Sequence, residues 1–169
     1  DVLKGSDEKD SFSPVVTERE AQPFEALREA SDLHLQTTGV RPRVFVASIG
    51  PSSENRAVMT FLTNLLASGG LIAALGEELD GTEAFAAAFA ASGSRSAIIC
   101  AARGQASEMV PLLARELKAL RARRVLFAGN PGRLENAWRE AGVDGFIRRD
   151  MDVVALLTEL LAAEGVDHG

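Results

Sequence analysis

The sequence predicts an α/β fold in which a parallel sheet of five strands is covered by helices on both faces. The main observation is alternation: from residue 43 to the end, short apolar runs alternate with longer segments whose apolar residues recur at helical spacing. A second observation is the placing of glycines, since Gly39, Gly69-Gly70 and Gly142 follow the ends of such helical segments. Strands joined through helices run parallel, so the sheet is predicted to be doubly wound.

Length and composition narrow the classes of protein. A chain of 169 residues fits one domain, or one domain with an arm. The net charge of −6 argues against a nucleic-acid partner, which would need clustered Lys and Arg. One cysteine excludes an internal disulfide and a cysteine-based zinc site, and it fits a reducing, cytoplasmic setting. No apolar run reaches the ~18 residues that a membrane span needs, so no membrane partner is expected.

The chain divides into three predicted regions. Residues 1–22 are expected to form a flexible linker, because the first fourteen are mostly polar and cannot bury enough apolar surface. Residues 23–42 are expected to form a helical arm that starts near Pro23 and stops at Gly39. Residues 43–169 are expected to form the α/β domain. Because the chain begins at Asp1 and not at Met, we expect it to be part of a longer protein.

The predicted strands are short runs rich in apolar residues, at 44–47, 71–75, 97–101, 125–128 and 145–147. The first helix of the domain is expected to be capped by Ser52 or Ser53. Its inward face should carry Ala57, Val58, Phe61, Leu62, Leu65 and Leu66.

The later helices follow the same logic. The second is the alanine-rich segment 82–91, and Ser107 is expected to cap a third, which runs to about Leu120 and turns Val110, Leu113, Leu117 and Leu120 inward. A fourth follows the turn 129–132, and Asp150 or Asp152 should cap the last.

The flavodoxin-like (Rossmann-like) strand order 2-1-3-4-5 is the expected arrangement for five such units. In this order, a ligand crevice lies where the order reverses, beyond the carboxyl ends of the first and third strands. The loops predicted to border it are therefore 50–56, 101–106 and 129–132.

Little in these loops predicts catalysis or metal binding. His34 lies in the arm and His168 near the end of the chain, and Cys100 lies within an apolar strand. A phosphoryl-accepting receiver domain shares this topology but needs acidic residues at the strand ends, which are absent here. Ser52-Ser53 could cap a helix or hold an anion, and Gly129-Asn130 could form a plain turn or admit a ligand. No catalytic or metal-ligating residue is therefore predicted.

The loop after the first strand resembles the cobalamin-binding domain of the acyl-CoA mutases. In that family the loop reads D-x-H-x-x-G, and its histidine is the lower ligand of cobalt. Here Ser52 stands at the aspartate position, Glu54 at the histidine position and Ala57 at the glycine position.

A narrower resemblance is to the small (beta) subunit of heterodimeric methylmalonyl-CoA mutase. It is carried over about residues 22–165 by PFEALR (23–28), Asp32, Thr38-Gly39, Arg41-Pro42, VFVASIGP (44–51), Gly69-Gly70, VLFAG (125–129), AGVDGFI (141–147) and DVVALL (152–157). The resemblance implies a subunit that binds no cofactor and pairs with a catalytic large subunit. That partner holds adenosylcobalamin and interconverts methylmalonyl-CoA and succinyl-CoA. A barrel domain precedes this region in the family, so the chain is expected to be an isolated C-terminal domain.

Glu54 is not expected to rescue cobalt binding, because it offers an anionic oxygen in place of a neutral nitrogen and its supporting aspartate has become Ser52. The resemblance therefore implies a vestigial crevice and a degenerate cobalamin-binding-like domain. The crevice would be formed by Gly50, Ser52, Ser53, Glu54, Ala57, Ala101, Ala102, Gly129 and Asn130. Two alternatives stay open: a cobalamin carrier that holds the cofactor base-on without a histidine, and a regulatory module that binds a small molecule.

Overall fold

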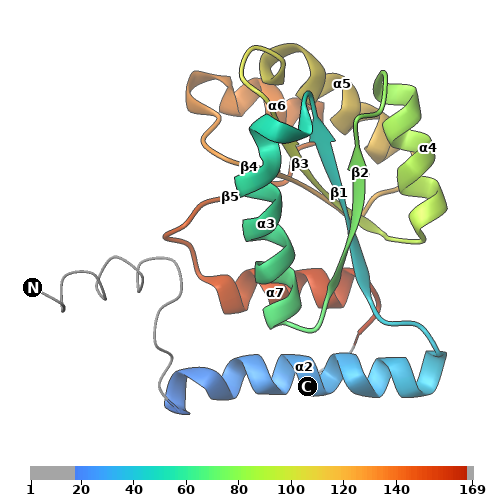
Figure 1. Cartoon of the computed structure of the whole chain (residues 1–169), viewed down its shortest axis with the longest axis vertical. Helices are drawn as coiled ribbons and strands as arrows, with labels where there is room; N and C mark the ends of the chain where they lie inside the picture. The colour runs from blue at the N-terminus through green and yellow to red at the C-terminus, as the bar shows by residue number, and fades with distance from the viewer. Residues whose placement is uncertain (1–17, 167–169) are drawn as a thin grey trace, which may run out of the picture.

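The computed structural model describes residues 18–166 and contains a five-stranded parallel sheet in the order β2-β1-β3-β4-β5 (Figure 1). This is the predicted flavodoxin-like order, which is thus confirmed. The strands, in chain order, are β1 (Arg43–Ile49), β2 (Ile72–Glu77), β3 (Ser96–Ala101), β4 (Arg124–Ala128) and β5 (Gly145–Ile147).

Helices connect the strands and flank the sheet. They are α2 (Glu18–Thr38), α3 (Ser52–Ser68), α4 (Thr82–Ser92), α5 (Ala106–Ala119), the 3-10 helix η1 (Gly132–Leu134), α6 (Glu135–Ala141) and α7 (Val153–Ala163). Within residues 18–166, none of the helices combines the length and the apolar character that crossing a membrane demands.

The sheet separates two apolar cores. On one face, α4, α5 and α6 cover a cluster whose largest fully buried side chains include Phe45, Phe85, Ile99, Leu113 and Leu117. On the other face, α3 and α7 cover a cluster whose larger members include Leu62, Leu66, Ile98, Leu157 and Leu160. Burial on both faces explains why the central strands are continuous apolar runs and not alternating ones.

Strand β1 lies between β2 and β3, with Val46 level with Leu75 on one side and with Ile98 on the other. The last paired residues of β1 and β3 are Ile49 and Ala101. The carboxyl ends of these strands therefore lie side by side, and the loops that follow them meet at one edge of the sheet, at the upper end of Figure 1.

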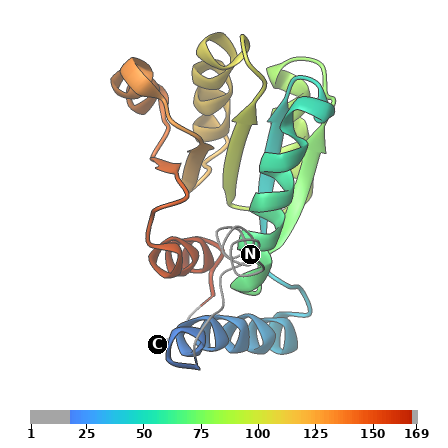
Figure 2. The same ribbon diagram turned by 60° about the vertical axis from the view of Figure 1, so that its left-hand side comes forward.

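The arm α2 lies at the opposite end, against α7, as both views show (Figures 1 and 2). Its inward residue Leu27 is buried, and the hydroxyl of Ser31 donates to the carbonyl of Gly70 at 2.6 Å. The helix begins at Glu18, so the predicted start near Pro23 was wrong, as was the linker assignment for residues 18–22. Proline inside a helix removes one donor and crowds the carbonyl four residues earlier, and the docking of the 21-residue helix outweighs this local cost. The rest of the predicted linker, and His168, lie outside the described residues.

Two of the predicted helix caps were wrong. The residue before α3 is Pro51, and neither Ser52 nor Ser53 caps it; the hydroxyl of Ser52 instead donates to Glu77 on β2. Helix α5 starts before Ser107, after Gln105. The cap at Asp152 is confirmed, since its carboxylate accepts the N–H of Ala155 at 3.0 Å.

The predicted inward faces of two helices were wrong at their borders. Ala57 and Phe61 on α3 are exposed, and so is Leu120, just past the end of α5. The stripe predicted on α3 was too wide for one helix face. The buried residues of α3 are Asn55, Met59, Leu62, Leu65 and Leu66, so the buried stripe begins with a polar residue.

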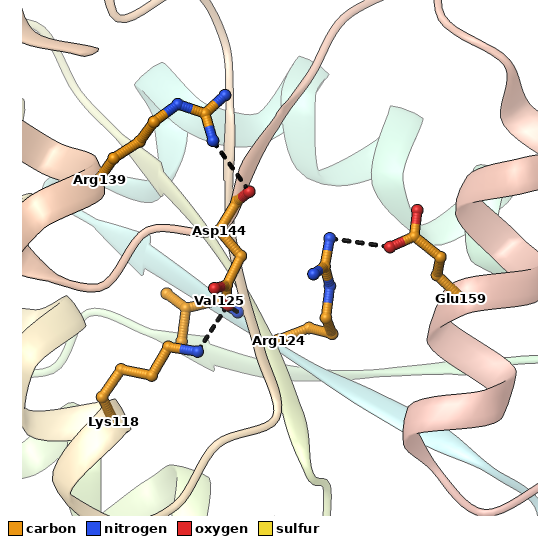
Figure 3. A network of polar contacts seen from close by, with 6 residues as sticks. All are labelled: Lys118, Arg124, Val125, Arg139, Asp144 and Glu159. Carbon is orange, nitrogen blue, oxygen red and sulfur yellow. Dashed lines mark hydrogen bonds and ion pairs between the residues drawn. The ribbon is translucent and has the colours of Figure 1, made fainter. Parts of the chain in front are cut away.

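Ion pairs join the second half of the fold (Figure 3). The Asp144 carboxylate accepts from Nζ of Lys118 on α5 at 2.6 Å and from the N–H of Val125 on β4 at 2.8 Å. Arg124 on β4 pairs with Glu159 on α7 at 2.8 Å. These contacts hold β4, the start of β5 and the two flanking layers in register.

A buried carboxylate closes the amino end of β3. Glu164 is 9% exposed, and its two oxygens accept the N–H of Arg95 at 3.1 and 3.0 Å and the hydroxyl of Ser94 at 3.2 Å. Burial raises the pKa of the Glu164 carboxyl above its ordinary value, although these hydrogen bonds oppose the shift.

The raised pKa of Glu164 predicts a pH-dependent stability. Just above the ordinary carboxyl pKa, the folded protein still holds this proton and the unfolded chain has released it, so raising the pH costs stability through this group. Relative to Glu164→Gln, the wild-type free energy of unfolding should therefore fall as the pH rises from about 4 towards 7. Urea unfolding of both proteins across this range measures the difference. A wild-type free energy of unfolding that rises with pH relative to Glu164→Gln would contradict the raised pKa of Glu164.

Candidate functional site

At the point where the strand order reverses, the loops after β1 and β3 touch each other. Gly50 has a φ of +96°, and a Cβ placed on it would lie 2.7 Å from Cβ of Ala102 and 3.1 Å from Nε2 of Gln105. The N–H of Ala102 donates to the carbonyl of Ile49 at 2.9 Å, which continues the pairing of the two strands. Gly50 is thus required for this close approach, and Ala102 is buried beneath it, with Ala101 half-buried.

A buried amide fixes the start of α3 to the end of β1. Nδ2 of Asn55, which is 3% exposed, donates to the hydroxyl of Ser48 and to the carbonyl of Ile49, both at 2.9 Å. Ser48 lies level with Cys100 on β3. Burial raises the pKa of the Cys100 thiol to about 11, so the thiol stays protonated and unreactive at neutral pH.

Asn55→Ala is expected to lower the free energy of unfolding by about 1–3 kcal/mol, because it leaves buried polar groups without a partner. Asn64→Ala, on the exposed side of the same helix, is the matched control and should change stability by less than about 0.5 kcal/mol. Chemical denaturation of the three proteins measures the two differences. Equal effects of the two substitutions would show that the Asn55 amide does not fix the loop.

The residues at the aspartate and histidine positions of the loop do not face each other. The hydroxyl of Ser52 is taken up by Oε1 of Glu77 at 2.9 Å, on the side of β2. Ser53 and Glu54 are exposed, and among residues 18–166 neither side chain has a hydrogen bond or ion pair. Glu54 therefore lies in solvent, and the relay that would orient a ligand at this position is missing.

The other predicted crevice residues, Ala57, Gly129 and Asn130, do lie together. They border a hollow of about 360 Å³ between α3 and the carboxyl ends of β4 and β5. Val58 and Phe61 of α3, Ala128, Ile147 and two arginines, Arg148 and Arg149, complete its lining. The structure thus places the predicted residues along one sheet edge but in three surroundings: a loop contact, an exposed helix start and this hollow.

Curated relatives carry one name. The chain is 37% identical over 148 residues to the methylmalonyl-CoA mutase small subunit of Streptomyces virginiae. It is 40% identical over 157 residues to the probable methylmalonyl-CoA mutase small subunits of Mycobacterium bovis and Mycobacterium tuberculosis. These matches cover 88% and 92% of this chain.

The chain is a homologue of part of the methylmalonyl-CoA mutase small subunit. It spans about a quarter of the length of these relatives, 23% to 25%. No protein-family model matches it.

Solved structures confirm the fold of this small-subunit homologue and nothing beyond it. A two-component response regulator from Clostridium difficile superposes with a TM-score of 0.53 at 9% identity, over 73% of this chain and 95% of the other. The receiver domain of a putative response regulator from Mycobacterium tuberculosis gives 0.52 at 15% identity, over 73% and 96%. In residues 18–166 of the homologue, no three or more His, Cys, Asp or Glu side chains are grouped so as to hold a metal.

The residues of the homologue do not fit a site that ligates cobalt. The carboxyl edge carries the exposed carboxylate of Glu54 where an imidazole would be needed, and Ser52 is bonded to Glu77. His34, the histidine within the described range, lies on α2 at the opposite end of the sheet (Figure 1). An exposed hard oxygen donor without a supporting partner is a poor substitute for a neutral nitrogen ligand.

Sequence reasoning missed three features of this edge. Asn55 lay in the loop 50–56 that was expected to border the crevice, but no role was assigned to it, although an asparagine one turn before Met59 on the buried stripe could have indicated one. The bond from Ser52 to Glu77 joins residues 25 apart, and no local pattern reports it. Ile147 ends the last strand and Arg148 follows it, and no role at this edge was assigned to either from the sequence.

Proposed function

We propose that this chain is a non-catalytic, cobalamin-binding-like domain of a methylmalonyl-CoA mutase small subunit, which supports assembly with the catalytic large subunit. Homology to the small subunit supports the first part of the proposal. The observation that supports the non-catalytic part is the exposed Glu54, which has no side-chain partner among residues 18–166 and stands where the cobalt-binding family has histidine.

The chemistry of the carboxyl edge agrees with a structural role. Catalysis of a rearrangement requires groups that converge on a substrate or cofactor. Here Glu54 is in solvent, Ser52 is engaged by Glu77, and Gly50 packs against Ala102. What the edge retains is the rigid framework of loops and helix ends, and a rigid framework suits the docking of another domain or subunit.

The proposal is tested on the complete small subunit purified with its large subunit. Glu54→Ala in the small subunit should leave both the bound cobalamin and the turnover of methylmalonyl-CoA unchanged, because the cofactor is held by the partner. Glu83→Ala on α4, another exposed first-turn glutamate, is the matched control. A loss of cobalamin or of turnover in Glu54→Ala alone would overturn the proposal.

A further inference from the structure

The hollow beside α3 resembles a binding site for a small molecule. Such a site does not depend on the proposed role in assembly. Its volume of about 360 Å³ lies within the range of ligand pockets in proteins, roughly 300–1,000 Å³. Side chains from three separate segments form its walls, with Val58 and Phe61 from α3, Ala128 from β4 and Ile147 from β5. These walls are apolar, and the ring of Phe61 is 37% exposed beside the hollow.

The polar groups at the rim of the hollow are donors. The guanidinium of Arg148 has no hydrogen bond or ion pair with any other residue in the range 18–166. Oδ1 of Asn130 accepts the N–H of Gly132 at 2.9 Å, which leaves its two amide hydrogens without a partner among the same residues. Among the residues that the structure describes, no Asp or Glu lines the hollow. Apolar walls below unpartnered donors suit a ligand with a hydrocarbon body and an anionic oxygen group.

We propose that the hollow binds a small organic anion, a carboxylate whose apolar body lies against Val58 and Ile147 and whose oxygens accept from Arg148 and Asn130. The size follows from the volume: at about 30 Å³ per water-sized atom group, the hollow holds roughly ten to twelve non-hydrogen atoms. The chain carries a net charge of −6, so nonspecific attraction would favour a cation. A measured preference for an anion would therefore have to come from the hollow itself.

Three probes with the same hydrocarbon chain test the proposal: octanoate, 1-octanol and octylammonium. Each is titrated into the ¹⁵N-labelled chain and followed by two-dimensional amide NMR spectra. Octanoate should bind saturably and most tightly, and its shifts should centre on residues 57–61, 128–130 and 147–148. Octylammonium should bind most weakly. Absence of saturable octanoate binding, equal affinities for the three probes, or shifts centred elsewhere would each overturn the proposal.

Two variants assign the roles of the parts. Arg148→Gln should weaken octanoate binding by roughly three- to tenfold and leave octanol binding within about twofold, because an exposed charged donor is lost and the walls are kept. Ala57→Phe should abolish the binding of both probes by filling the mouth of the hollow. Ala87→Phe, at an exposed position on α4 across the sheet, is the control for an added ring and should change neither. An unchanged octanoate affinity in Arg148→Gln would remove the anion from the proposal.

Discussion

Phe45→Ala is expected to lower the free energy of unfolding by about 3–5 kcal/mol, a large share of the stability of a domain this size. The ring is 2% exposed and packs edge-on against Phe89 of α4, with 5.9 Å between the ring centroids. Gly76 on β2 leaves room for it, since a Cβ there would lie 2.6 Å from Cζ of Phe45. Truncation would leave a cavity between β1, β2 and α4 that close-packed neighbours cannot fill.

Urea denaturation of Phe45→Ala beside the wild type measures this loss. Phe61→Ala removes the same group from the exposed side of α3 and should cost about 1 kcal/mol or less. Comparable losses from the two substitutions would mean that the core between the sheet and α4 is not packed as described.

Gly70→Ala is expected to lower the free energy of unfolding by roughly 2–5 kcal/mol and to release the arm α2 from the rest of the domain. Gly70 has a φ of +82°, and a Cβ on it would lie 2.6 Å from Cβ of Ser31 and 3.3 Å from Cα of Arg28. The added methyl group therefore meets the backbone of the arm, which cannot rotate away. It would also break the 2.6 Å bond from the Ser31 hydroxyl to the Gly70 carbonyl.

Gly39→Ala separates backbone strain from the clash. Gly39 has nearly the same φ, +81°, and no atom of the described part of the chain lies within 4 Å of an added Cβ. It should cost only about 1–2 kcal/mol and leave α2 docked. Amide hydrogen exchange of residues 24–38, together with unfolding curves, measures both effects. If α2 exchanges equally slowly in both variants, the arm is not held by the contact at Gly70.

The order of the strands and helices could be predicted from the sequence because the patterns typical of buried strands and of helices are both clear. The apolar runs from Val44 and Ile98 are too short for helices, and the segments between them carry apolar residues at helical spacing. Right-handed crossovers then leave few arrangements for five parallel strands. The cap at Asp152 was also local, because its carboxylate reaches only three residues along the chain.

What could not be predicted depends on contacts between distant residues. Ser52 was expected to cap α3 by local chemistry, but Glu77 competes for its hydroxyl once β2 is in place. Periodicity alone could not choose which border of α3 faces the core, so Phe61 was expected inside and lies at the hollow. Likewise, the need for glycine at position 50 arises only when Ala102, 52 residues away in the chain, packs against it.

We propose that this domain resembles a cobalamin-binding domain but does not ligate cobalt. The most direct measurement is a titration of the purified chain with hydroxocobalamin, followed by visible absorbance and by equilibrium dialysis. We expect an unchanged spectrum and no retained cofactor. Tight, stoichiometric retention with a shifted spectrum would contradict the claim, and retention with an unshifted spectrum would instead indicate a carrier that holds the cofactor base-on.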